Sequence, residues 1–396
     1  MTALALRNYT LVTSLGAGRA ATLAALQAGR SGLAPCHFDT LPLAAYVGEV
    51  AGLEAHRLTG TWAAYDCRNH RLAALALAQD GFLDSVAAAR LRYGAARIGL
   101  FLGTSTSGIL ETEAAYRQRD PVGLLPATFD YARTHNTYAL GMFVRDYLQL
   151  KGPAVVVSTA CAATSKVFAS AARMIAAGLC DAAIVGGADT LCDTTLFGFH
   201  ALGVMAEGPC RPFGAARSGI SIGEAAGFAL LEKAGPQHGA ETVLLLGAGE
   251  SSDAYHMSSP DPQGAGAQRA MLQALAQAGM RAEEIDYINL HGTATLAGDA
   301  AEDCAITSLF GDRVPCSSSK GFTGHTLGAS GMVGVAVCAL ALQHGFLPGS
   351  PHTNEVDRSF GSQYVLAGRP ARIRRVISNA FGFGGVNCSL VLGRAL

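Results

Sequence analysis

Hydrophobic residues form two kinds of pattern along this chain. Short continuous apolar runs bounded by turn residues predict buried parallel strands at 98–102, 154–158, 182–186, 285–290 and 376–379. Longer Ala-rich stretches with helical spacing predict helices at 19–29, 84–92, 163–178, 268–279 and 329–345. Alternation of this kind is typical of an α/β fold in which helices cover the faces of mainly parallel sheets.

This pattern recurs once along the chain. The strand at 154–158 leads through a turn into the small-residue helix at 163–178, and a run at 314–319 leads through 320–325 into the helix that ends at 345. A polar stretch containing Gly and Pro, at 233–242, lies between them. We therefore expect two related halves, residues 1–237 and 238–396, whose equivalent turns face each other.

Composition and charge exclude several classes of protein. Only 15% of the 396 residues are charged, whereas a typical soluble domain has about 25%, and the formal net charge is −1. High hydrophobicity argues against disorder, and the absence of a basic block argues against nucleic acid as the main partner. The ten cysteines form no CxxC pair, so neither a zinc site nor a disulfide framework is expected. The first residues lack the features of a signal peptide, so we expect a cytoplasmic protein.

One uncharged segment requires a test for membrane insertion. Residues 321–354 contain no Asp, Glu, Lys or Arg, and 327–343 are almost wholly small or apolar. The segment contains Ser330 and three glycines, and it is shorter than the run of about 20 apolar residues that a spanning helix needs. We predict a buried helix that packs closely through Gly and Ala, and no membrane association.

Two residues lie where a strand gives way to a turn. Cys161 precedes the helix at 163–178, where free backbone N–H groups and the helix dipole favour a thiolate, and we expect a lowered thiol pKa. Alternatively, it is a small buried hydrophobe like most free cysteines. His291 follows the strand at 285–290, at the end where α/β sheets bind ligands, although a hydrogen-bonded structural histidine would fit equally well.

The second half adds a lysine, another histidine and a glycine-rich loop. Lys320 and His325 share a Gly-rich turn that enters the uncharged helix, where a lysine needs a partner or a function unless it is exposed at the surface. The segment NAFGFGGVN at 379–387 contains Phe383 between glycines that permit close backbone approach. A thiol, two histidines, a buried lysine and this loop are the parts of an acyl-transfer site.

Four segments resemble the signatures of the elongating β-ketoacyl-acyl-carrier-protein synthases. They are STAC at 158–161, HGTAT at 291–295, KGFTGHTLGASG at 320–331 and NAFGFGGVN at 379–387. The resemblance implies an α/β, thiolase-like five-layered αβαβα fold made of two related halves. It also implies a homodimer, or a heterodimer with a related synthase subunit.

The same resemblance implies a role for each residue of the predicted site. Cys161 would accept an acyl group as a thioester, and His291 and His325 would promote decarboxylation of malonyl carrier protein, which gives the enolate for Claisen condensation. Lys320 would orient His325. The backbone N–H groups of Cys161 and Phe383 would form the oxyanion hole, as fixed donors commonly do in acyl transfer.

Binding residues also follow from the resemblance. Thr293 and Thr295 match positions that contact phosphopantetheine, which arrives on the acyl carrier protein, so no separate cofactor and no metal are expected. By analogy, Phe197, Phe199 and Ile109 would line the acyl pocket. The expected product is a 3-oxoacyl carrier protein in fatty acid synthesis or in a specialised polyene or polyketide-like pathway.

Two alternatives remain open at this stage. The chain could be a chain-length partner of a heterodimeric synthase whose own cysteine is idle, or a thiolase with Cys388 as a second catalytic cysteine. One departure from the family pattern bears on Lys320, because a family glutamate that supports this lysine falls on Gly334. We expect another group to compensate the ammonium, or the ammonium to be less stabilised.

Overall fold

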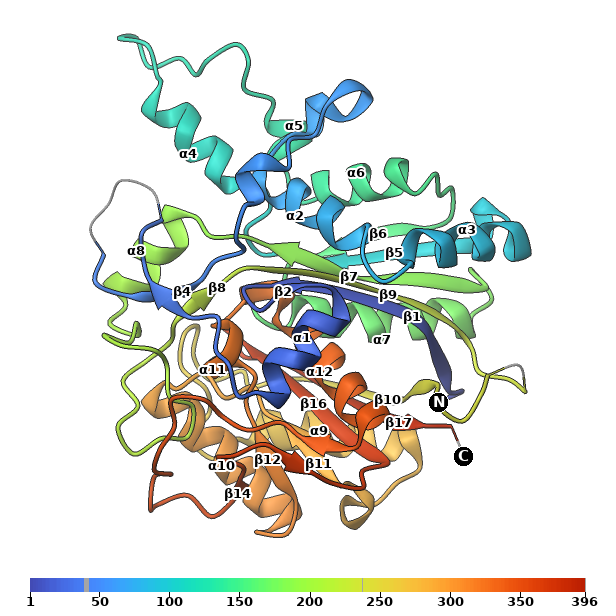
Figure 1. Ribbon diagram of the computed structural model, residues 1–396, viewed down its shortest axis with the longest axis vertical. Coiled ribbons are helices and arrows are strands. Elements are labelled where there is room, and N and C mark those ends of the chain that lie inside the picture. The colour runs from blue at the N-terminus through green and yellow to red at the C-terminus, as the bar shows by residue number, and fades with distance from the viewer. Residues whose placement is uncertain (39–42, 237, 396) are drawn as a thin grey trace.

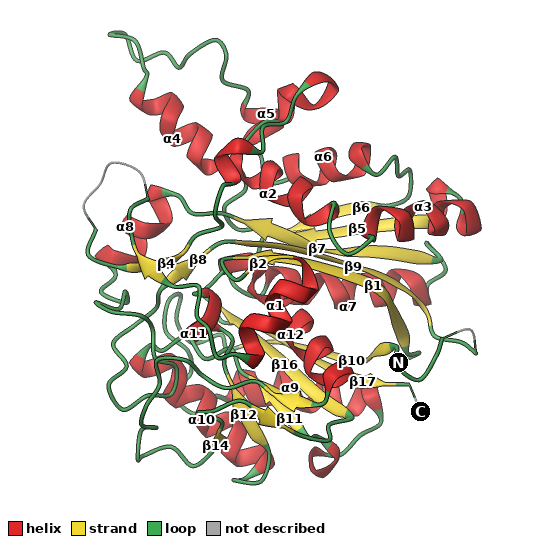
Figure 2. Ribbon diagram, in the orientation of Figure 1, coloured by secondary structure: helices red, strands yellow, loops and turns green. Residues whose placement is uncertain are grey.

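Two sheets and three helical layers alternate through the molecule, as Figures 1 and 2 show. The computed structural model describes residues 1–38, 43–236 and 238–395. The first sheet has the strand order β1 (Leu4–Thr13), β9 (Ala225–Lys233), β7 (Ala182–Asp189), β5 (Ile98–Gly103) and β6 (Ala154–Val157). The second has the order β10 (Val243–Ser252), β17 (Val386–Arg394), β16 (Arg375–Gly382), β11 (Tyr287–Asn289), β12 (Pro315–Ser317) and β14 (Gln363–Tyr364).

The two sheets repeat one topology. In the first, β9 is antiparallel to both β1 and β7, and β7, β5 and β6 are parallel. In the second, β17 is antiparallel to both β10 and β16, and β16, β11 and β12 are parallel. A short antiparallel contact between β1 and β10, with Leu4 opposite Leu245, joins the two sheets into one continuous 12-stranded sheet. Residue 237, where the sequence divides into halves, lies outside the described residues, so the boundary itself stays a prediction.

Helices complete the layers. The outer face of the first sheet is covered by α2 (Arg68–Leu77), α3 (Phe82–Tyr93) and α6 (Ala139–Tyr147). Between the sheets lie α1 (Gly18–Gln27), α7 (Ala163–Ala176) and α12 (Ser330–His344), and the outer face of the second sheet is covered by α9 (Ala265–Ala278) and α10 (Leu296–Phe310). Each of the three helical layers therefore has its own buried apolar cluster.

Shorter elements connect these layers. The helices are α4 (Ile109–Arg117), α5 (Tyr131–Thr134), α8 (Asp193–Ala201) and α11 (Lys320–Thr323). The strands are β2 (Gly16–Ala17), β3 (Ala34–Pro35), β4 (Tyr46–Gly48), β8 (Ile222–Gly223), β13 (Phe346–Leu347) and β15 (Arg369–Pro370).

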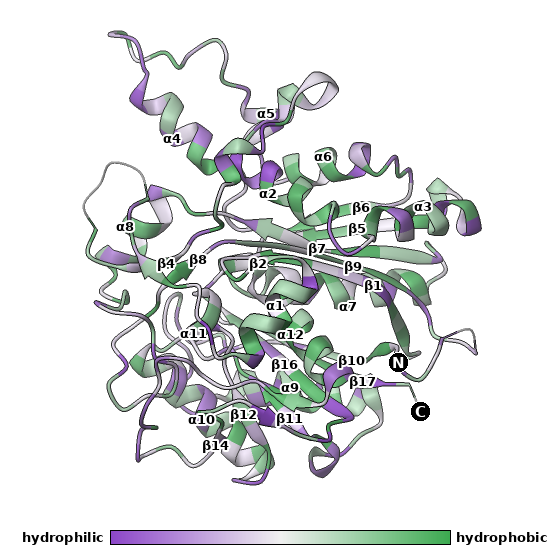
Figure 3. Cartoon of the chain, in the orientation of Figure 1, coloured by the Kyte–Doolittle hydropathy of each residue, from purple (hydrophilic) through white to green (hydrophobic). Residues whose placement is uncertain are grey.

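The uncharged helix predicted near the second active-site turn is α12, in the middle layer. Figure 3 shows the apolar character of this layer. Among the described residues one helical segment, Leu327–His344, is long and apolar enough to cross a membrane, but 83% of it is buried inside the protein. A Cβ added at Gly331 would stand 2.3 Å from the Ser165 hydroxyl of α7, so glycine is required for this helix contact. The prediction of a buried helix that packs through small residues is therefore confirmed.

The strand predicted at 154–158 departs from expectation in its burial. It forms β6, which lies at the edge of the first sheet, and the Val155 side chain is 41% exposed. The prediction of a buried strand was wrong because a run of apolar residues fits both a central strand and an edge strand, and the sequence alone does not distinguish the two. Helices α2 and α10 were not among the predicted helices. Only α10 lacks a clear run of apolar residues at helical spacing, since Leu72, Ala73, Ala76 and Leu77 of α2 follow that spacing and are buried.

Candidate active site

Cys161 lies in the turn between β6 and α7. The preceding Ala160 has a φ of 46°, in the left-handed region that non-glycine residues rarely adopt. This turn brings Cys161 to the amino-terminal end of α7, which begins two residues later. The Cys161 residue is 7% exposed. Like the nucleophile turn of other α/β enzymes, the strained backbone presents one side chain above the end of a parallel strand.

His325 reaches Cys161 from the other half of the protein. Its Nε2 atom lies 3.0 Å from the Cys161 sulfur. The backbone of His325 is fixed by a hydrogen bond from its N–H to the carbonyl of Ser221, at 2.7 Å. The equivalent turns of the two halves thus face each other, as the sequence predicts, and they place a proton acceptor beside a thiol.

His291 and Lys320 lie next to this pair. The rings of His291 and His325 are 5.4 Å apart between centroids and nearly perpendicular. The Lys320 ammonium donates a hydrogen bond to the backbone carbonyl of His291, and its Nζ lies 3.4 Å from His291 Nδ1. Lys320 therefore contacts His291, whereas the sequence analysis expected it to orient His325. The lysine is buried, so the alternative of an exposed surface lysine was wrong.

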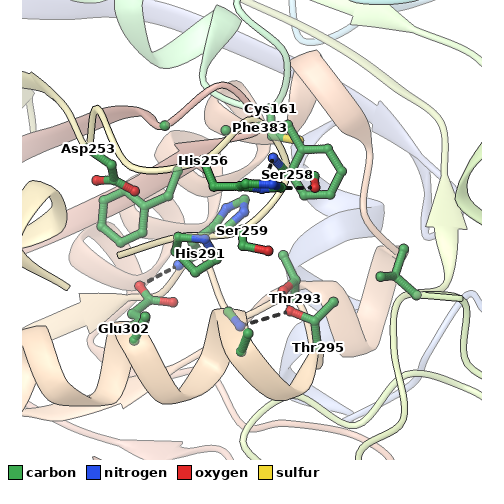
Figure 4. Close-up of a pocket in the computed structure, with 18 of the residues that line it drawn as sticks. Cys161, Asp253, His256, Ser258, Ser259, His291, Thr293, Thr295, Glu302 and Phe383 are labelled. Atoms are coloured by element: carbon green, nitrogen blue, oxygen red, sulfur yellow. Dashed lines mark hydrogen bonds between the residues drawn. The ribbon is translucent and has the colours of Figure 1, made fainter. Parts of the chain in front are cut away.

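Glu302 is a residue of this site that the sequence analysis missed. It lies on α10, and its carboxylate accepts hydrogen bonds from the backbone N–H groups of His291 (2.8 Å) and Gly292 (2.6 Å), as Figure 4 shows for His291. Burial lowers the pKa of Lys320 and raises the pKa of Glu302, and the attraction between the two charges opposes both shifts. Glu302 therefore provides the negative charge near Lys320 that Gly334 cannot provide. Gly334 itself faces β11 and β16, where an added Cβ would stand 2.6 Å from the Ser378 hydroxyl.

Burial decides the protonation of the site. Desolvation raises the pKa of the Cys161 thiol to about 11, although the charge of Lys320 acts in the opposite direction. The expected lowering of this pKa by the helix terminus was therefore wrong. Burial, together with the Lys320 charge, lowers the pKa of both His291 and His325 well below the ordinary value. The resting site holds a neutral thiol and two neutral imidazoles.

Two backbone N–H groups act on the Cys161 sulfur. Hydrogen bonds from the N–H groups of Phe383 and of Cys161 itself lower the pKa of the thiol. The Phe383 backbone can approach because the loop continues through Gly384 and Gly385, which have φ values of 83° and 74°. These two donors are the pair that the sequence analysis assigned to an oxyanion hole.

The catalytic side chains open into a cavity of about 330 Å³. Thr293 and Thr295 line it, and their hydroxyl oxygens are 2.9 Å apart. Phe199 also lines it, with its ring 5.8 Å from that of Phe383. Phe197 and Ile109 do not line this cavity, so their place in an acyl pocket stays a prediction.

The segment from Asp253 to Asp261 forms another part of the cavity wall that the sequence analysis missed. Figure 4 shows Asp253, His256, Ser258 and Ser259 near the Phe383 loop. The Gly384 N–H donates to the carbonyl of Met257, at 2.7 Å, and so joins this segment to the loop. Its polar, Pro-containing sequence gave no sign of a site, because only the fold brings it to the cavity.

Comparison with known proteins assigns the family. Two family models match, the N-terminal domain of β-ketoacyl synthase over residues 68–236 and the C-terminal domain over residues 243–354. The chain is 36% identical to 3-oxoacyl-[acyl-carrier-protein] synthase 2 of Rhizobium meliloti (strain 1021), over 75% of this chain and 74% of the relative. It is 31% identical to the synthase of the same name from Vibrio cholerae, over 93% of this chain and 94% of that one.

This chain belongs to the β-ketoacyl synthase family. It is similar throughout its length to a solved ketosynthase in complex with its chain length factor from Xenorhabdus doucetiae, at 35% identity and a TM-score of 0.89, over 100% of this chain and 98% of that one. The ishigamide ketosynthase/chain length factor gives 28% identity and a TM-score of 0.91 over 100% of both chains. The predicted thiolase-like fold, β-ketoacyl synthase activity and acyltransferase class are therefore confirmed.

Proposed function

We propose that this β-ketoacyl synthase loads an acyl group from acyl carrier protein onto Cys161 and condenses it with malonyl carrier protein. The observation that carries the proposal is the 3.0 Å contact between Cys161 Sγ and His325 Nε2 at the wall of the cavity. A thiol with a pKa of about 11 is almost wholly protonated at neutral pH. It therefore needs a base that takes its proton during attack, and His325 occupies that place.

In the loading step, Cys161 Sγ attacks the carbonyl carbon of the acyl thioester while His325 Nε2 takes the thiol proton. The oxygen of the tetrahedral intermediate accepts hydrogen bonds from the N–H groups of Cys161 and Phe383. The carbon–sulfur bond to pantetheine then breaks, and the proton on His325 passes to the departing thiol. Cys161 is left as a thioester and His325 is again neutral.

In the condensation step, His291 and His325 donate hydrogen bonds to the thioester oxygen of malonyl carrier protein. For this His325 carries its proton on Nε2, so after loading it changes tautomer by exchange of a proton with solvent. Lys320 donates toward His291 Nδ1, which leaves the His291 proton on Nε2. Carbon dioxide departs, and the electrons of the broken bond form an enolate whose oxygen these two N–H groups stabilise. The enolate carbon attacks the Cys161 thioester, a carbon–carbon bond forms as the carbon–sulfur bond breaks, and the departing thiolate takes a proton from solvent.

The proposal extends to partners and pathway. The structural relatives that contain a chain length factor support a heterodimer with a related subunit, in a specialised polyene or polyketide-like pathway. The edge strand β6, with Val155 exposed, offers unpaired backbone groups for a second subunit, whether identical or related. Thr293 and Thr295 would contact the pantetheine arm, and Phe199 would contact the acyl chain. That the enzyme needs neither metal nor separate cofactor, and acts in the cytoplasm, stays a prediction.

A condensation assay with acyl and malonyl carrier proteins tests the proposal. The wild type, with its partner subunit where one is required, should form 3-oxoacyl carrier protein, and Cys161→Ala should not. Cys36→Ala is the matched control, because Cys36 lies outside the cavity and should be dispensable. Absence of product with every acyl donor would refute the proposal.

Two further readouts separate the alternatives. An idle Cys161 that stays unlabelled by cerulenin in the intact complex would favour a chain-length partner. Activity on free coenzyme A thioesters without a malonyl substrate would favour a thiolase. The structure argues against the thiolase, since Cys388 is buried in β17 and does not line the cavity.

A further inference from the structure

Asp189 is a fully buried carboxylate beside the catalytic turn, and it has no part in the steps above. It is the last residue of β7, and 0% of it is exposed. Hydrogen bonds reach its two oxygens from Thr104 Oγ1 (2.7 Å), Ser105 N (2.8 Å), Ser105 Oγ (2.6 Å), Thr106 N (2.8 Å), Thr106 Oγ1 (2.8 Å) and Gly328 N (2.6 Å). Every one of these groups can donate, and an ionised carboxylate can only accept, so the donor set fits the charged form.

No Lys or Arg within the described ranges forms an ion pair with Asp189. A buried charge is costly unless hydrogen bonds replace its hydration, and six donors do so here. Because the Asp189 carboxylate is costly to bury, we expect it to have a role beyond packing. The residues that donate to it indicate that role.

The bond to Gly328 links the two halves of the active site. Gly328 lies three residues after His325, and its N–H donates to Asp189 while its carbonyl accepts a hydrogen bond from Thr164 Oγ1 at 2.6 Å. Thr164 in turn lies three residues after Cys161, on α7. The turn that follows His325 is therefore held from one side by β7 and from the other by the helix that follows Cys161.

The atoms around Gly328 are closely packed. A Cβ added at Gly328 would stand 2.6 Å from the nearer Asp189 oxygen. Ser330 Oγ also donates to the Cys161 carbonyl, at 3.1 Å. The distance between Cys161 Sγ and His325 Nε2 is thus set by short bonds that converge on Gly328 and Ser330.

We propose that Asp189 is a positioning residue, which fixes the Gly328 turn so that His325 Nε2 meets the Cys161 sulfur. This role rests on the proposed transfer of an acyl group to Cys161. Alkylation of the free thiol does not require that transfer, so it tests the contact between His325 and Cys161 separately.

Asp189→Asn tests this role, with kcat for condensation and the rate of Cys161 alkylation by iodoacetamide, located by peptide mass spectrometry, as readouts across pH 6 to 10. The amide has the same size as the carboxylate but places an NH2 group opposite hydrogen-bond donors, so the Gly328 turn should loosen and kcat should fall about tenfold or more. When the contact with His325 Nε2 is lost, the thiol has no adjacent acceptor for its proton, so alkylation at pH 8 should slow about threefold or more and the loss should become smaller toward pH 10. A purely structural role would lower both rates by the same factor at every pH.

Two variants complete the design. Asp303→Asn is the matched control, because the buried Asp303 carboxylate also accepts backbone bonds, from Gly361 and Ser362, but does not line the cavity. It should leave both readouts unchanged. Thr164→Val removes the opposite bond to Gly328, so kcat and the alkylation rate at pH 8 should both fall.

Each outcome has one consequence. Wild-type kcat and a wild-type alkylation profile in Asp189→Asn, or in Thr164→Val where the first variant does not fold, overturn the positioning role. A fall of both rates by the same factor at every pH overturns it as well. A wild type that fails to condense any substrate refutes the proposed function instead, and the alkylation comparison still tests the contact between His325 and Cys161.

Discussion

Replacement of Lys320 by methionine removes the positive charge nearest to the catalytic histidines. The Lys320 Nζ lies 3.4 Å from His291 Nδ1. Two unit charges at that separation repel each other by about 5 kcal/mol at an effective dielectric constant of 20. Lys320 therefore imposes a large penalty on protonated His291, and the neutral imidazole that the enolate requires is maintained in mildly acidic solution.

Removal of the Lys320 charge should raise the pKa of the two nearby histidines. Burial lowers the pKa of His291 and His325 most, and the positive charge of Lys320 lowers both further, so removal of that charge raises them. In Lys320→Met the histidines should bind protons at higher pH than in the wild type. Because the proposed condensation step uses neutral His291 and neutral His325 as the donors to the enolate oxygen, decarboxylation in Lys320→Met should fail at higher pH on the acid side than in the wild type.

The assay is release of carbon dioxide from malonyl carrier protein between pH 5 and pH 8.5. The acid limb of Lys320→Met should move to higher pH, in addition to a general loss of rate from the missing bond to the His291 carbonyl. Lys320→Arg retains the charge and is the control, since its acid limb should stay near that of the wild type at a reduced rate. An acid limb at the same pH in Lys320→Met and the wild type would refute the electrostatic argument.

Three further substitutions have defined outcomes. Gly334→Val should lower the free energy of unfolding by about 1–3 kcal/mol, measured by denaturant titration, because the added Cβ would press on β16; an unchanged midpoint would contradict this packing. Val155→Arg should weaken subunit association in sedimentation without loss of helix content, since Val155 is exposed on an edge strand; equal association would place the interface elsewhere. Phe199→Ala should change the chain lengths of the products seen by mass spectrometry, because its ring packs on Phe383 at the cavity wall; an identical product profile would remove Phe199 from the acyl pocket.

The parts of the site that could be predicted are those carried by contiguous residues. Cys161, His291 and His325 each follow or begin a recognisable turn, and the surrounding short segments are distinctive in themselves. The duplicated strand, turn and helix also indicated that the turns would face each other. These features depend on local chain geometry, which neighbouring residues determine.

The parts that could not be predicted depend on contacts between distant segments. Glu302 reaches the backbone of His291 only because α10 packs beside β11, and Asp189 gathers donors from residues 104–106 and 328. The pKa of the Cys161 thiol could not be predicted for the same reason. The sequence analysis expected a lowered pKa, whereas burial raises it. A helix terminus is a local influence of about 0.3–1 kcal/mol, whereas burial depends on the whole fold and dominates here.

The small residues of the central helices are a condition of the chemistry as well as of the packing. Cys161 precedes α7 and His325 precedes α12, so the distance between their reactive atoms depends on how closely these two helices approach. Gly331 permits contact with Ser165 that no side chain would allow. A thiol with a pKa near 11 gains nucleophilicity only when the acceptor is in hydrogen-bond contact, at the observed 3.0 Å. The low fraction of charged residues and the close helix packing therefore serve one requirement. They allow a buried contact between the neutral Cys161 thiol and the neutral His325 imidazole, which come from different halves of the chain.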